Sequence, residues 1–182
     1  MGGENTQVYV CSRQYSCLTV RANGSWVDLL WSEPSLRAII LSDYGDWSYR
    51  WQSIGSSSLS GFLASLDCDY MGNKMLGDQM LQVDTPATCL AVKEIIDEME
   101  AYGDLSGDRL DNERDLLAEL ETGDMPLDAW GVQTSLPEIF SLVRHKMTPV
   151  WMGFWERLWV PYVQPALLRV DEGDVPENGH LV

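Results

Sequence analysis

The dipeptide Asn23-Gly24 constrains the fold of this chain more than any other short feature of its sequence. A two-residue type I′ turn needs positive φ at both central positions, and Asn followed by Gly tolerates this best. We therefore expect a β-hairpin over about residues 18–29. Once the turn is fixed, the register follows. It places three pairs on one face of the hairpin: Ala22 with Ser25, Val20 with Val27, and Leu18 with Leu29.

Further segments with strand composition surround this hairpin. They are Gln7–Arg13, residues 36–41, and the alternating aromatics Trp47, Tyr49 and Trp51, which a strand would place on one face. Together they predict a mostly antiparallel sheet of about four or five strands that ends near residue 54. Trp26 and Leu30 would point away from the hairpin's apolar pairs, so we also expect cover on both faces of the sheet.

After Gly55 the spacing of apolar residues becomes helical. Asp84-Thr85-Pro86 predicts the start of a helix that ends at Gly103, and a second helix is predicted over residues 107–122, before Gly123. The first helix should turn four apolar side chains towards the core: Leu90, Ile95, Ile96 and Met99.

Two more helices are predicted towards the end of the chain. Ser135-Leu-Pro-Glu138 has the spacing of a capping box for a helix over residues 139–146. Pro149 opens a last helix over residues 150–160, and Pro161 and Pro165 are expected to end regular structure.

These elements predict an α+β fold, with the N-terminal sheet packed against the C-terminal helices. With 182 residues, 45% of them hydrophobic, the chain suits one domain that buries a sizeable core. We expect residues 1–54 to be mainly β, residues 55–165 mainly α, and residues 166–182 a loose acidic tail.

The stretch from residue 43 to residue 76 has the least generic sequence. An aromatic strand, a glycine turn and two short amphipathic segments follow one another there, and this order resembles a family of small acidic uncharacterised proteins of phages and prophages. The resemblance rests on Gly45, Trp47, Tyr49, Arg50, Trp51, Gly55, Phe62, Leu63, Asp67, Tyr70 and Lys74. It implies a mobile-element origin and a bacterial cytosol, and it implies no reaction. From the residues alone, the aromatics are either a structural joint between the last strand and the first helix or part of a ligand site.

Acidic residues dominate the charge, with 28 Asp and Glu against 12 Lys and Arg, a net charge of −16. This balance argues against binding to nucleic acid or to an anionic membrane, because both need a basic surface. It favours a basic partner, or serves solubility alone. Thirteen of the acids fall between residues 94 and 128. The candidate partner-binding residues are Glu94, Asp97 and Glu98 on the first predicted helix and Asp108, Asp111, Asp115 and Glu119 on the second. We expect Arg114 to relieve the repulsion at Asp111.

Tryptophans at positions 151, 155 and 159 form a stripe at helical spacing in the last predicted helix. Such a stripe is either core or interface, since tryptophan concentrates binding energy at interfaces. A possible second interface comprises Trp47, Tyr49, Trp51, Trp151 and Trp155.

No motif indicates catalysis, a metal site or a cofactor. The four cysteines lack zinc-ligand spacing, and the serine-rich turn at residues 55–61 is neither a nucleophile elbow nor a phosphate loop. No segment resembles a secretion signal or a membrane span, so we expect a soluble cytoplasmic protein.

Three hypotheses of function remain open. The first is a non-enzymatic inhibitor of the anti-CRISPR or anti-restriction type, whose acidic helices imitate nucleic acid and bind a basic host defence protein. The second is a phage assembly protein that self-associates, for instance as a homodimer, through its tryptophans. The third is a hydrolase that uses carboxylates or a metal.

Overall fold

The computed structural model describes residues 14–174, which group into two compact units. Unit 1 contains residues 14–80 and 149–174 of this range, and unit 2 is Leu81–Thr148. The single-domain organisation stays a prediction. The strand predicted over Gln7–Arg13 lies outside the described residues.

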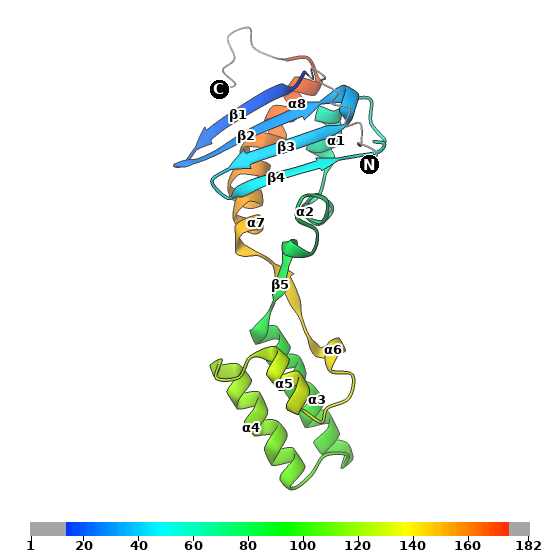
Figure 1. Cartoon of the computed structure of the whole chain (residues 1–182), viewed down its shortest axis with the longest axis vertical. Helices are drawn as coiled ribbons and strands as arrows, with labels where there is room; N and C mark the ends of the chain where they lie inside the picture. Colours follow the sequence, from blue (N-terminus) through cyan, green and yellow to red (C-terminus); the bar gives the residue numbers. More distant parts are fainter. Residues whose placement is uncertain (1–13, 175–182) are drawn as a thin grey trace, which may run out of the picture. The chain divides into compact units, whose positions relative to one another are not determined.

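The sheet of unit 1 has four antiparallel strands in the order in which they follow along the chain (Figure 1). These are β1 (Ser16–Ala22), β2 (Ser25–Ser32), β3 (Arg37–Ser42) and β4 (Gly45–Arg50), with a short 3₁₀ helix, η1 (Glu33–Ser35), between β2 and β3. The predicted α+β fold with an N-terminal antiparallel sheet is confirmed.

The hairpin that links β1 and β2 turns at Asn23-Gly24, as predicted. Both residues have positive φ, 53° at Asn23 and 81° at Gly24, as a type I′ turn requires. All three expected pairs are present: Ala22 with Ser25, Val20 with Val27, and Leu18 with Leu29.

Helices cover one face of this sheet (Figure 1). They are α1 (Leu59–Ser65), α2 (Cys68–Leu76), which leads into the 3₁₀ helix η2 (Gly77–Met80), and the segments α7 (Pro149–Phe154) and α8 (Gln164–Asp171), which are joined by a π-helix over Trp155–Val163. Buried side chains of the central strands face these helices, among them Val27, Leu29 and Ile40. Trp26 and Leu30 on the opposite face are half-buried, and no described helix covers that face.

The prediction that the last helix ends at its prolines is wrong. Pro161 lies inside the π-helix, whose wider turns accommodate a residue that lacks an N–H, and Pro165 lies in α8, which continues from the π-helix without a break. The prediction of a loose tail from residue 166 is also wrong for residues 166–171. These residues belong to α8, and Ala166 and Leu167 are buried within unit 1.

Unit 2 is a small helical bundle with a two-stranded ribbon (Figure 1). Its elements are β5 (Leu81–Val83), α3 (Thr85–Tyr102), α4 (Asp108–Thr122), α5 (Leu127–Gln133), α6 (Ile139–Leu142) and β6 (His145–Met147). β5 and β6 pair antiparallel. The core is largely aliphatic and includes Val92, Ile96 and Leu117, with Trp130 as its one aromatic member among the described residues.

The predicted caps of the two long helices are confirmed. The Asp84 side chain accepts the Ala87 N–H at the start of α3, and Gly103 and Gly123 end α3 and α4 with φ of 79° and 81°. Leu90, which we expected in the core, is 59% exposed, because Cys89, Val92 and Ile96 already fill the buried face of α3.

The capping box predicted at Ser135–Glu138 is wrong. Glu113 Oε1 accepts hydrogen bonds from both the N–H and the hydroxyl of Ser135, at 2.7 and 2.8 Å, so Ser135 does not cap a helix. Glu138 takes the position before α6 with a left-handed φ of 50°. The helix expected over residues 139–146 is therefore only four residues long and is followed by β6.

Candidate surface for a protein partner

Seven carboxylates on α3 and α4 form what we call the acidic face. They are the seven predicted binding residues: Glu94, Asp97, Glu98, Asp108, Asp111, Asp115 and Glu119. All seven are exposed. The structure therefore places these acids on the exposed sides of the two long helices of unit 2.

On α4 the acidic face lies opposite the buried side. Asp111, Asp115 and Glu119 follow each other at four-residue steps of about 6 Å, and the buried leucines of the same helix occupy the other side. Because the leucines and the carboxylates lie on opposite sides, α4 tolerates neighbouring like charges. The leucines pack the helix against the core, and the carboxylates stay in water.

Few cations neutralise the acidic face. Arg114, expected to relieve Asp111, instead pairs with Glu100 on α3 at 2.7 Å and so joins the two helices. Lys93 pairs with Asp97 at 3.5 Å. Among residues 14–174, the other six acids of the face have no ion pair within 4.0 Å. Their charge is therefore available to an approaching partner.

Glu113 differs from the other twelve acids of residues 94–128, because it is 1% exposed while they are exposed. Its carboxylate accepts hydrogen bonds from Ser135 and, at 2.6 Å, from the hydroxyl of Thr134. It thus fixes the loop after α5 to α4. The sequence carried a signal for this burial, since Glu113 lies three residues from both Leu110 and Leu116 on the buried stripe.

The aromatic residues of the possible second interface are buried or half-buried in unit 1. Trp51 is 4% exposed and Trp151 is fully buried, which removes both from any surface. Trp47 is half-buried, and its ring centroid lies 5.2 Å from that of Trp151. Trp155 is also half-buried and stacks on the buried Trp159 at 5.9 Å. The tryptophan stripe is therefore mostly core.

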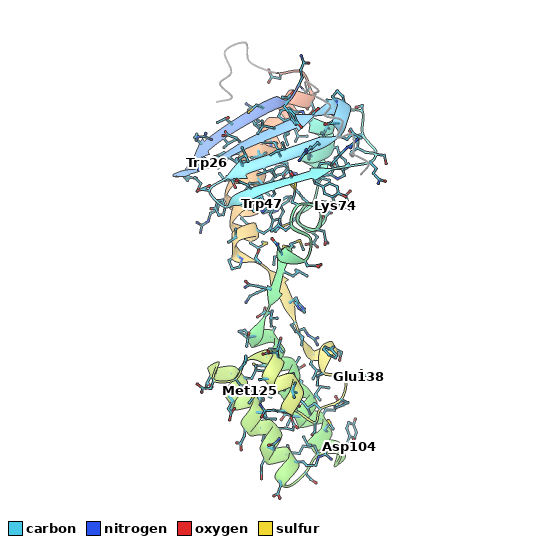
Figure 2. All side chains as sticks on the ribbon, in the orientation of Figure 1. Trp26, Trp47, Lys74, Asp104, Met125 and Glu138 are labelled. Carbon is cyan, nitrogen blue, oxygen red and sulfur yellow. The ribbon has the colours of Figure 1, made fainter. Side chains whose placement is uncertain are left out.

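The aromatic strand also forms the joint that one interpretation of the sequence predicted. Tyr49 contacts Trp51 at 4.9 Å between ring centroids, and Trp51 contacts Phe62 of α1 at 5.5 Å. Lys74, labelled beside β4 in Figure 2, places its ammonium 5.5 Å from the Tyr49 ring and 5.4 Å from the Tyr70 ring. These contacts connect β4 to α1 and α2, so the motif residues have a structural role.

Residues 14–174 were also compared with the arrangements that metal sites and membrane spans require. These residues contain no group of three or more His, Cys, Asp or Glu side chains arranged to hold a metal ion. Within the same range, no helix is long and apolar enough to cross a membrane.

Comparison with known proteins places the chain in a family. A family model described as a phage family matches residues 9–169, which is most of the sequence. This chain belongs to that phage family. Membership confirms the phage resemblance seen around the aromatic strand, and the description attaches no activity to the family. No curated protein and no solved structure matches the chain.

Proposed function

We propose that this phage-family protein is a non-enzymatic inhibitor that binds a basic, nucleic-acid-handling protein of the host through the acidic face of unit 2. Host defence proteins of the restriction or CRISPR type present the required kind of surface, because they hold nucleic acid with lysine and arginine. The acidic face would compete with nucleic acid for those side chains.

The observation that carries the proposal is the exposure of all seven carboxylates, six of them without an ion pair in the described part of the chain. A surface that serves stability alone usually mixes charges of both signs. Like charges at four-residue spacing cost roughly 0.2–0.5 kcal/mol per pair. A partner with complementary charge offsets this cost and gains a faster association rate.

The burial of Trp151 and Trp159 favours this proposal over self-association through the tryptophan stripe. These two side chains stabilise unit 1, and of the three tryptophans in the stripe only the half-buried Trp155 reaches the surface of that unit. The net charge of −16 also opposes self-association, because two copies of the chain repel each other.

A competition assay tests the proposal. The partner is isolated from the bacterial host with a tagged copy of the chain, and the chain then competes with nucleic acid for that partner at two salt concentrations. We expect added salt to weaken binding steeply, since exposed charges are screened beyond about 8 Å at physiological ionic strength. Reversal of Asp111, Asp115 and Glu119 to Lys should abolish competition. Undiminished competition by this variant would contradict the proposal.

A further inference from the structure

Unit 2 exposes two large apolar side chains almost completely. Phe140 on α6 is 89% exposed and Val132 on α5 is 86% exposed. Their neighbours along the chain behave differently: Leu142 is 6% exposed and Trp130 is 1% exposed. Both segments therefore contribute one side chain to the core of unit 2, while Phe140 and Val132 remain outside that core.

The two exposed side chains lie on elements that pack together. A Cβ atom built on Gly131 would lie 3.5 Å from Cδ1 of Ile139, so α5 and α6 meet at these two residues. Val132 and Phe140 each follow directly after one of them. The two side chains therefore lie on adjacent segments of unit 2, and we use the name apolar patch for these two residues.

Hydrogen bonds fix the chain on both sides of the apolar patch. Before α6, Glu113 accepts hydrogen bonds from Thr134 and Ser135. After α6, the Arg144 N–H donates to the hydroxyl of the buried Thr88 at 3.0 Å, and the Arg144 carbonyl accepts the Asp84 N–H at 2.8 Å. Phe140 is thus held on a short segment that is tied at both ends.

The backbone conformation at the start of this segment is unusual. Glu138, labelled in Figure 2, has a φ of 50°, which non-glycine residues adopt only at a cost. A segment kept in such a conformation while it presents an exposed aromatic ring resembles a pre-organised anchor, because little chain entropy is lost when a partner covers it.

Charge determines what can cover the apolar patch. Asp128 lies four residues before Val132 on the same side of α5, and Glu138 lies two residues before Phe140; both are exposed. Unit 2 as a whole has 15 acidic and five basic residues, a net charge of −10. Nucleic acid, an anionic membrane and a second copy of unit 2 are all negative and would be repelled.

The geometry points to the apolar patch as the anchor for a basic protein segment that carries an apolar side chain between lysines or arginines. This inference rests on the proposed function, which supplies a basic partner, and it adds the contact that holds the partner in place. The acidic face raises the rate of encounter, while burial of Phe140 and Val132 slows dissociation.

Two synthetic peptides of equal lysine content test the anchor, one with a central Leu and the other with Ser at that position. Each is titrated into the full chain at low salt. We expect the Leu peptide to bind about tenfold more tightly, since burial of one apolar side chain is sufficient for such a difference. Phe140→Ser should remove the preference and leave the affinity for the Ser peptide unchanged. Because Phe140 is 89% exposed, this variant should fold normally, which circular dichroism checks.

Three outcomes would overturn the anchor. One is equal affinity of both peptides for the unmodified chain. Another is a preference for Leu that survives in Phe140→Ser. The last is concentration-dependent dimerisation that Phe140→Ser abolishes, which would assign the patch to a second copy.

The acidic face is tested separately with the same peptides. If the reversal of Asp111, Asp115 and Glu119 to Lys leaves both affinities unchanged, the proposed function fails. The preference for Leu would still report on the anchor, so the two failures are distinguishable.

Discussion

Units 1 and 2 differ in where their most buried and most exposed aromatic side chains lie. In unit 1 the aromatic residues fill the interior, where Trp151, Phe154 and Trp159 are each fully buried beneath the sheet. In unit 2 the core is mostly aliphatic, and Phe140 remains outside it. Charge is also unequal, since unit 2 has a net charge of −10 over 68 residues and the rest of the sequence has −6 over 114 residues.

This difference agrees with the proposed division of labour, in which unit 1 provides stability and unit 2 binds the partner. In unit 1, the tryptophans that the sequence suggested for an interface are largely used in packing within the unit. Unit 2 combines a charged exterior with exposed apolar side chains, a combination typical of surfaces that bind other proteins.

The largest effect should come from two aromatic substitutions, one in each unit. Trp159→Ala should lower the free energy of unfolding by roughly 3–5 kcal/mol, because it removes a fully buried side chain from unit 1. Phe140→Ala should change it by less than about 0.5 kcal/mol, since that side chain makes few contacts. Urea denaturation followed by circular dichroism measures both. Equal losses would remove the contrast between the units.

Within unit 2, the buried carboxylate should matter more than the exposed ones. Glu113→Ala leaves the donors of Thr134 and Ser135 without their acceptor and should cost roughly 1–3 kcal/mol. Glu119→Ala is the matched control on the same helix and should be nearly neutral, because Glu119 is exposed. Thermal unfolding of the two variants gives the comparison. A neutral Glu113→Ala would show that the loop before α6 does not depend on this carboxylate.

A smaller effect is expected at the hairpin turn of unit 1. Gly24→Val forces a β-branched residue to a φ of 81° and should destabilise the sheet by roughly 1–2 kcal/mol. Gly55→Val is the control, because Gly55 has no positive φ and a Cβ there meets no atom within 4 Å. Melting temperatures of the two variants distinguish turn strain from a general effect of valine. If both variants melt at the same temperature, the turn is not strained.

Local patterns predicted much of the fold. The turn at Asn23-Gly24, the register of β1 and β2 and the caps of α3 and α4 all follow from short-range rules, and each is confirmed. The errors arose where a distant contact outweighs a local signal. Ser135 has the spacing of a capping residue, but Glu113, 22 residues away, takes its hydrogen bonds. Pro161 usually ends a helix, but the π-helical segment accommodates it.

The candidate surface was predicted in part for a similar reason. Spacing along α4 was sufficient to place Asp111, Asp115 and Glu119 opposite the leucines, because helix periodicity is local. The exposure of Phe140 could not be predicted, since it depends on how α5 and α6 meet at Gly131 and on the left-handed conformation of Glu138. An isolated phenylalanine in a short helix is ordinarily assigned to the core.

One measurement tests the division of labour most directly: the affinity for the co-purified partner of two variants with equal charge change. The first reverses Asp111, Asp115 and Glu119 of unit 2 to Lys. The second reverses three acids of unit 1 that are also exposed, Asp46, Asp78 and Glu156. If binding depends on the acidic face, the unit 2 variant should lose at least about tenfold in affinity at physiological salt, while the unit 1 variant should stay close to the unmodified chain. Equal weakening in both variants would mean that net charge alone attracts the partner, and it would contradict the assignment of binding to unit 2.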